Sequence, residues 1–283
     1  MYSIKEFINW ALGHAQPGSV PEGAAFPDGA EPAADPWQYL FGSIMVRTTQ
    51  ATLDKYFADH YSKQMTRAEF DRITASWSRS GYATDCEGLL DAWLTYFMDD
   101  PTDLNSDGNY RLWCTEKGLI DEIRRPYVIG EAVFRQGAEG RMTHVGWICG
   151  FLNGEPLVIE ARGIRFGVVV SELKKRSFTH RGLMTAIFDY GEDKAMPIHL
   201  ELTSPYMRSD AVLALQFALN ELGYTDANGR RLTEDGKLGP NTMFAVEEFA
   251  NNQQTICRPN DSPVFLIPSE SGDYRLRVTV EAE

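Results

Sequence analysis

Three residue types that together can break an amide bond follow one another along the chain in the order cysteine, histidine, carboxylate. They are Cys86, His144 and Glu160. A thiol needs a base to remove its proton, and an imidazole titrates near neutral pH and can return that proton to a leaving amine. A carboxylate that accepts the other ring N–H would hold the imidazole in place. The pattern therefore indicates acyl transfer, with Cys86 as nucleophile, His144 as base and Glu160 as the orienting residue.

Each of these roles has a plainer alternative. Cysteine is among the residue types most often buried, so Cys86 is equally read as a structural residue. Glu160 is equally read as an exposed carboxylate on a strand. Three of the other histidines lie at the ends of expected elements and are expected at the surface: His14, His60 and His199. The fourth, His180, could line a cleft or be structural.

An amphipathic helix is expected to carry Cys86. Apolar residues recur after it at helical spacing, at Leu89, Leu90, Trp93, Leu94 and Phe97. Thr84 followed three residues later by Glu87 is a capping-box pattern, which predicts that the helix begins at or just before Cys86. Because a helix N-terminus carries partial positive charge, this position is expected to lower the pKa of the thiol.

The remaining pattern predicts an α+β fold, with helices first and an antiparallel sheet after them. Helices are expected over residues 4–15, 50–60, 66–76 and 110–117, and strands over 128–134, 144–149, 157–161, 163–170 and 185–190. Asn153-Gly154 is a hairpin signal between two of the strands. A strict two-residue turn there would point residues 144 and 160 to opposite faces, so the catalytic interpretation requires a loop with an odd number of residues.

Composition narrows the classes of partner. The chain has 283 residues and a net charge of −13, which makes nucleic acid an unsuitable partner. The cysteines Cys86, Cys114, Cys149 and Cys257 have no metal-ligand spacing, and residues 103–108 resemble half of a calcium loop whose twelfth position is Cys114, so we expect no metal and no cofactor. We also expect no signal peptide and no contact with membrane, since no basic segment precedes a long apolar run.

Three short motifs in order resemble those of NlpC/P60 cysteine peptidases. They are Asp85-Cys86-Glu87-Gly88-Leu89, Thr143-His144-Val145-Gly146, and Val158-Ile159-Glu160-Ala161-Arg162-Gly163 with Gly167-Val168. The resemblance covers most of residues 1–195 and implies a papain-like fold of helices packed on an antiparallel sheet. It implies hydrolysis of stem-peptide amide bonds in bacterial peptidoglycan, between D-glutamate and the following diamino acid, with Tyr39 and Asp85 holding the free amine of the stem.

Two positions depart from the usual pattern of that family. Glu87 stands where Ser is usual, and Glu160 stands where His, Asn or Gln is usual. A carboxylate beside Cys86 opposes formation of the thiolate, whereas a carboxylate beside His144 makes the imidazole more basic. An amidase that cuts between lactate and L-alanine, and a catalytically inactive wall-binding protein, therefore remain alternatives.

The rest of the chain resembles a small three-helix peptidoglycan-binding bundle. One helix is expected over 210–222 and another from 241 or 242 to about 249, joined by a polar loop. We expect three parts: a peptidase-like domain over 1–195, a linker from 195 to 205 and the bundle over 205–256, and an extension over 257–283 with two strand-like pieces. The sequence does not fix the oligomeric state, and the resemblance together with the expected lack of a signal peptide fits a phage or prophage lysin that acts on the cell wall.

Overall fold

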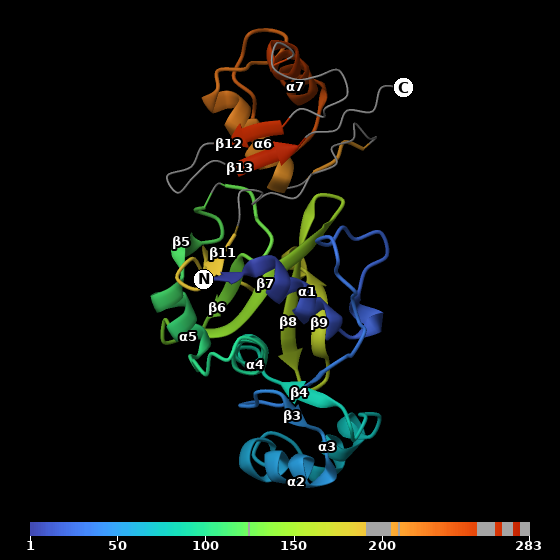
Figure 1. Ribbon diagram of the computed structural model, residues 1–283. Helices are drawn as coiled ribbons and strands as arrows, with labels where there is room; N and C mark the ends of the chain where they lie inside the picture. The colour runs from blue at the N-terminus through green and yellow to red at the C-terminus, as the bar shows by residue number, and fades with distance from the viewer. Residues whose placement is uncertain (124, 191–204, 209, 254–263, 268–273, 278–283) are drawn as a thin grey trace. The chain divides into compact units, whose positions relative to one another are not determined.

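The structure of the protein is a computed structural model that describes residues 1–123, 125–190, 205–208, 210–253, 264–267 and 274–277 (Figure 1). The chain divides into two compact units. The first unit comprises Met1–Ile120, Ile129–Gly150 and Pro156–Tyr190, and the second comprises Asp121–Val128, Phe151–Glu155 and Gly191–Glu283. Most of the expected linker at 195–205 lies outside the described residues.

The first unit contains most of the expected helices. They are α1 (Ile4–Gly13), α2 (Gln50–Tyr56), α3 (Arg67–Thr74) and α4 (Gly88–Phe97). The single helical turn α5 (Ser106–Gly108) was not expected. Hydroxyl side chains cap the first three, since Ser3, Thr49 and Thr66 each accept a bond from the backbone N–H three residues on. The helix expected over 110–117 is wrong. A π-helical turn over Asn109–Trp113 leads instead into a strand, β5 (Thr115–Leu119).

A six-stranded sheet follows, which confirms the α+β class. Its strand order is β5-β10-β6-β7-β8-β9, and the pairs β5–β10, β10–β6, β6–β7 and β8–β9 are antiparallel. The strands are β6 (Ala132–Gln136), β7 (Met142–Leu152), β8 (Glu155–Gly163), β9 (Gly167–Glu172) and β10 (His180–Leu183). Sequence patterns did not predict β10. The expected strand at 185–190 does not continue this sheet, because β11 (Phe188–Asp189) pairs in parallel with β1 (Tyr2–Ser3).

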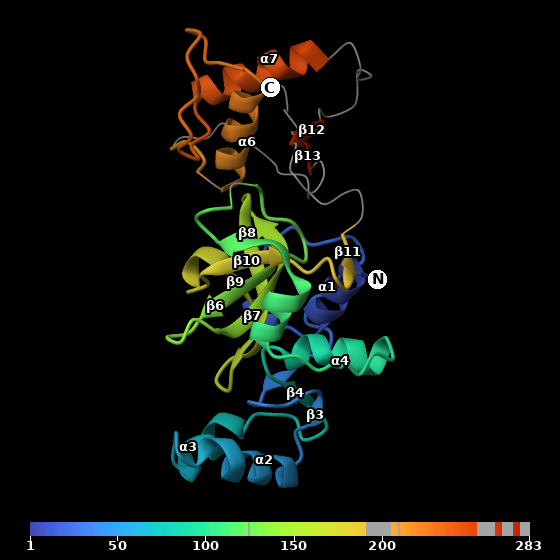
Figure 2. The same cartoon turned by 90° about the vertical axis from the view of Figure 1, so that its left-hand side faces the viewer.

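An aromatic cluster joins the helix that follows Cys86 to the strand that carries His144. The ring of Phe7 in α1 lies 5.5 Å from Trp93 of α4, 5.1 Å from Trp147 of β7 and 5.5 Å from Phe188, measured between ring centroids. Phe7 and Trp147 are fully buried, and Figure 2 shows α1 and α4 beside the sheet. Since aromatic pairs in such geometry stabilise beyond their buried area, the cluster fixes α4 against β7.

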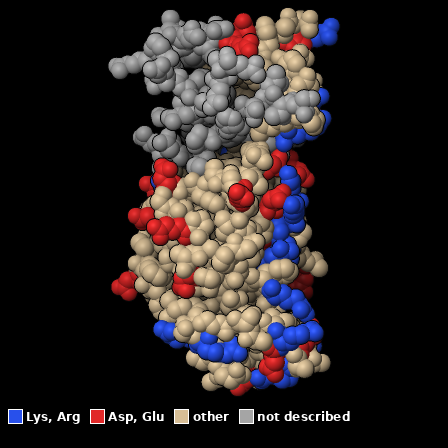
Figure 3. Space-filling view, turned by 90° about the vertical axis from the view of Figure 1, so that its right-hand side faces the viewer, with Lys and Arg blue, Asp and Glu red and all other residues tan. Residues whose placement is uncertain are grey.

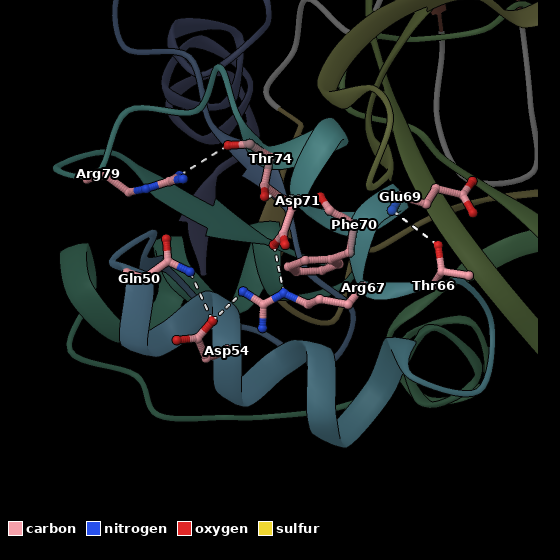
Figure 4. A network of polar contacts seen from close by, with 9 residues as sticks. All are labelled: Gln50, Asp54, Thr66, Arg67, Glu69, Phe70, Asp71, Thr74 and Arg79. Atoms are coloured by element: carbon pink, nitrogen blue, oxygen red, sulfur yellow. Dashed lines mark hydrogen bonds and ion pairs between the residues drawn. The ribbon is translucent and has the colours of Figure 1, made fainter.

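Helices α2 and α3 form a satellite packed on their own apolar core. Phe70, Leu53 and Tyr61 are buried there together with Leu40 and Ala83. On the outer side, Arg67 bridges the two helices by contacting Asp54 of α2 at 2.6 Å and Asp71 of α3 at 2.7 Å (Figure 4). These exposed ion pairs stabilise little, so the buried core is what holds the satellite.

The surface carries both signs of charge despite the net charge of −13. On the face drawn in Figure 3, Lys and Arg gather along one border, and the centre is largely uncharged. Among the described residues, no helix has both the length and the apolar character that a membrane crossing requires.

The second unit contains two of the three helices expected there, α6 (Asp210–Glu221) and α7 (Pro240–Gln253); the described residues include no third. The buried Gln216 side chain organises the polar loop between them. Its amide nitrogen donates to Asp235, the Lys237 carbonyl and Thr242, and its oxygen accepts from the amides of Asp235 and Gly236. The two expected strand-like pieces are β12 (Val264–Ile267) and β13 (Tyr274–Arg277), which pair antiparallel.

Gly88 allows the close approach on which the position of Cys86 depends. A Cβ at Gly88 would lie 2.2 Å from the Ser43 carbonyl oxygen and 2.8 Å from the Thr84 hydroxyl. Gly88→Ala should therefore lower the free energy of unfolding by about 2 kcal/mol, the scale of overpacking, as measured by urea denaturation. Gly18→Ala is the matched control, because nothing lies within 4 Å of its added carbon. Equal stability of the two variants would contradict this explanation.

Candidate active site

Cys86 lies on a turn between a strand and a helix. The strand is β4 (Tyr82–Thr84), the middle one of three, between β2 (Gln38–Tyr39) and β3 (Val46–Arg47). The turn spans residues 85–87, and α4 begins at Gly88, two residues later than expected. The turn presents the thiol immediately before a rigid helix.

The expected capping box is wrong, because Asp85 performs the capping. Asp85 Oδ1 accepts bonds from the amides of Glu87 at 3.1 Å and Gly88 at 2.7 Å, and its Oδ2 accepts from Gly42 at 2.9 Å. The Thr84 hydroxyl instead donates to the Ser43 carbonyl. The Glu87 side chain makes no cap and turns into the protein, where it is buried.

The Cys86 thiol is half-buried and lies against the strand of the predicted base. Its sulfur lies 3.9 Å from the Ser106 hydroxyl, and the backbone amide of Val145, the residue directly after His144, favours its ionised form. Burial, followed by the charge of Asp85, raises the pKa of this thiol to about 12, although the Ser106 hydroxyl and the Val145 amide oppose the shift. The expected lowering of the pKa is therefore wrong, and the neutral thiol needs a base to become a nucleophile.

A buried network of hydrogen bonds and an ion pair holds the His144 side chain. His144 Nε2 lies 2.7 Å from Glu160 Oε2, and Arg176 binds Glu160 through two nitrogens at 2.5 and 2.9 Å. Burial opposes ionisation of Glu160, yet the bonds from His144 and Arg176 lower its pKa to about 2. With Nε2 engaged, Nδ1 is the ring nitrogen left for proton transfer. The Phe178 ring stacks on the imidazole at a centroid distance of 5.6 Å.

His144 and Glu160 meet despite a two-residue turn. Strand β7 ends at Leu152 and β8 begins at Glu155, and both turn residues have positive φ, 52° for Asn153 and 79° for Gly154. The expected odd-numbered loop is thus wrong. A Cβ on Gly146 would lie 3.2 Å from the Glu160 Cβ, on the His144 side. One strand must therefore carry one extra residue before this point, as in a β-bulge.

Tyr39 and Asp85 lie beside the thiol, as the resemblance implies. Tyr39 pairs with Thr84 across the β2–β4 ladder. Burial raises the pKa of Tyr39, and the charges of Cys86 and Asp85 add to the shift, so its hydroxyl stays protonated and can donate or accept. Both oxygens of Asp85 serve the turn: Oδ1 accepts two bonds there, whereas Oδ2 accepts one and retains capacity for another. The structure brings all five predicted residues to one region.

Sequence reasoning missed Arg176, Ser106 and Phe178. The buried charge of Glu160 requires a cation, but the run Lys174-Lys175-Arg176 does not reveal which residue supplies it. The expectation that His14 lies at the surface is wrong, because its ring is buried and stacks on Trp37 at 3.9 Å between centroids. Ser106 could not be predicted from the sequence, because it reaches Cys86 only through the fold of residues 105–109.

No family model matches the sequence, and no curated protein matches it. Among solved structures, the chain is similar to one titled crystal structure of NlpC/p60 domain of peptidoglycan hydrolase SagA. The identity is 19%, the TM-score is 0.27, and the match covers 38% of this chain and 80% of that chain. A likeness of this extent carries no weight for function, which must be inferred from the site itself.

Arg176→Met should expose the dependence of Glu160 on its cation. The pKa of Glu160 is about 2 in the folded protein and about 4.3 in an unfolded chain, so its ionisation stabilises the native state by about 3 kcal/mol above pH 4.5. Because His144 still binds Glu160 in the variant, it should lose a substantial part of this free energy at pH 7. The difference from wild type should shrink as the pH falls from 4.5 to 2, measured by urea denaturation. Lys175→Met, which removes one charge from the same turn, is the control. A pH-independent difference would contradict this account.

Proposed function

We propose that the protein is a cell-wall hydrolase in which Cys86 cleaves amide bonds in the stem peptides of bacterial peptidoglycan. The observation that carries the proposal is the Cys86 thiol beside the strand of His144, whose Val145 amide favours the ionised sulfur and whose imidazole is held by Glu160. The substrate class comes from the resemblance of the three motifs to NlpC/P60 peptidases. The site supplies the nucleophile, base and orienting charge that such a reaction needs.

The reaction proceeds in two acyl-transfer steps. The Cys86 sulfur attacks the carbonyl carbon of the stem peptide, and the thiol proton passes to Nδ1 of His144. The C–N bond then breaks, and the amine departs with that proton, which leaves a thioester on Cys86. Water, deprotonated by His144, attacks the thioester and releases the carboxylic acid and the free thiol.

Glu160 and Arg176 act as one neutral unit behind the imidazole. The NlpC/P60 resemblance implies a neutral residue at position 160, and here a carboxylate and a guanidinium cancel each other's charge. Glu160 accepts the Nε2 proton and fixes the tautomer that leaves Nδ1 free to act as base. The departure from the usual residue is therefore compatible with catalysis.

The oxyanion site differs from a simple helix N-terminus. The amides of Glu87 and Gly88 already donate to Asp85, so they do not serve a developing oxyanion. The Cys86 amide precedes both of them and is the donor we assign to this role. A donor at this position stabilises charge that develops only in the transition state.

The bond cleaved in this proposal joins D-glutamate to the following diamino acid. Tyr39 and Asp85 hold the free amine at the other end of the stem, because a carboxylate beside a neutral hydroxyl attracts an ammonium group. The rival amidase would cut between lactate and L-alanine, before that amine exists. Mass analysis of the fragments from defined muropeptides separates the two.

The chain after residue 205 has a targeting role in this proposal. We assign residues 1–195 to catalysis, 205–256 to peptidoglycan binding and 257–283 to an extension without an assigned role. A wall-binding module tethered to the hydrolase raises the local concentration of enzyme on the polymer. A phage or prophage origin, with release from the cytoplasm, would suit this arrangement.

Cys86→Ala and His144→Ala should each lower fragment release from purified peptidoglycan by a factor on the order of 10³ or more, since either change removes a reacting group. Mass spectrometry of the soluble fragments measures this loss. Cys257→Ser is the thiol control, because it lies outside the proposed catalytic part. Fragment release by Cys86→Ala at the wild-type rate would disprove the proposed function.

The inactive wall-binding alternative makes a different prediction. In our proposal, Cys86→Ala still sediments with insoluble peptidoglycan as fully as wild type does, because binding does not use the thiol. Wild type alone should then solubilise the wall over time. Sedimentation of both proteins, with no fragments from either, would favour the wall-binding alternative.

A further inference from the structure

A second polar cluster lies next to the site, on the first turns of α4. Glu87, Asp91 and Asp103 each place a carboxylate oxygen within 4.8 Å of the others. Glu87 is 7% exposed and Asp91 1%, whereas Asp103 is exposed. Among the described residues, none of the three forms an ion pair with Lys, Arg or His. The cluster is therefore a buried negative site that opens to solvent at Asp103.

Two buried oxygens at this cluster have no donor among the described residues. They are Asp91 Oδ1 and Asn109 Oδ1. Asn109 is fully buried, and its amide nitrogen donates to Glu87 Oε1 at 2.8 Å, so the oxygen of the same amide lies at the edge of the cluster. An unpartnered buried acceptor is costly, and a cation would satisfy both oxygens at once.

We propose that Glu87, Asp91 and Asp103, with Asn109 as a fourth ligand, bind a hard divalent cation of the calcium type. Carboxylate and amide oxygens are the ligands that such cations prefer. Two oxygens bound to one Ca²⁺ at 2.3–2.6 Å lie at most about 5 Å apart, which the separation of the three carboxylates satisfies. The exposed Asp103 provides the route of entry.

Burial leaves the Glu87 and Asp91 carboxylates close together, with oxygens within 4.8 Å of each other. Buried carboxylates in such proximity need a compensating partner. The sequence predicted no metal here, and residues 103–108 resemble only half of a calcium loop. Two side chains of that segment are engaged within the protein, since Asp107 accepts from the Met142 amide and Asn105 from the Gly108 amide.

Binding of Ca²⁺ to the full-length chain, measured by equilibrium dialysis at pH 7.5, tests the proposal without any measurement of hydrolysis. We expect one Ca²⁺ per chain with a Kd on the order of 10⁻⁴ M. Asp103→Asn should weaken binding at least about tenfold while the circular dichroism spectrum is unchanged, because this exposed ligand is not needed for folding. Asp99→Asn, which removes an exposed charge nearby, should bind as wild type does.

Thermal unfolding provides a second readout. Ca²⁺ should raise the Tm of wild type and of Asp99→Asn but not that of Asp103→Asn, since a ligand that binds only the folded chain stabilises it. No uptake by folded wild type at 10 mM Ca²⁺ would overturn the proposal and leave a shared proton as the compensation. Equal weakening by Asp99→Asn and Asp103→Asn would overturn it as well, because it would show general attraction to acidic surface.

Discussion

The burial of a single carboxylate charge constrains the whole candidate site. Glu160 is fully buried, and its charge is tolerated because His144 and Arg176 both bind it. The three residues come from β7, β8 and the segment after β9, so their contact fixes the relative positions of these strands. Breaking such a pair is far more costly than its net contribution suggests, since it leaves an uncompensated charge. The imidazole is thereby held with Nδ1 free.

The second constraint is that the cysteine turn must reach this sheet. The Phe7 cluster holds α4 against β7, and Gly146 leaves no side chain between that strand and Glu160. Asp85 ties the turn to both Gly42 and the start of α4. This arrangement places three carboxylates near the start of one helix, which is electrostatically unfavourable: Asp85, Glu87 and Asp91. Two of these side chains, Glu87 and Asp91, are buried, and in our proposal a cation compensates their charge.

The sequence predicted the α+β class, the helix after Cys86 and the proximity of His144 to Glu160, because periodicity and residue type are local signals. It did not predict β10, since the run His180–Leu183 is short and includes a buried arginine, Arg181. It assigned the cap to Thr84 and not to Asp85, because both fit a helix start and only the contact with Ser43 decides between them. Arg176 and the one-residue shift between β7 and β8 depend on long-range packing, which no short pattern encodes.

The central claim is that the Cys86 sulfur and the His144 imidazole face one another closely enough to exchange a proton. Treatment with 1,3-dibromoacetone, a short reagent with two alkylating carbons, followed by peptide mapping tests this directly. The account predicts a single cross-link that joins Cys86 to His144, with loss of both bromides as bromide ions. Alkylation of Cys86 alone, or a link from Cys86 to a different residue, would contradict it.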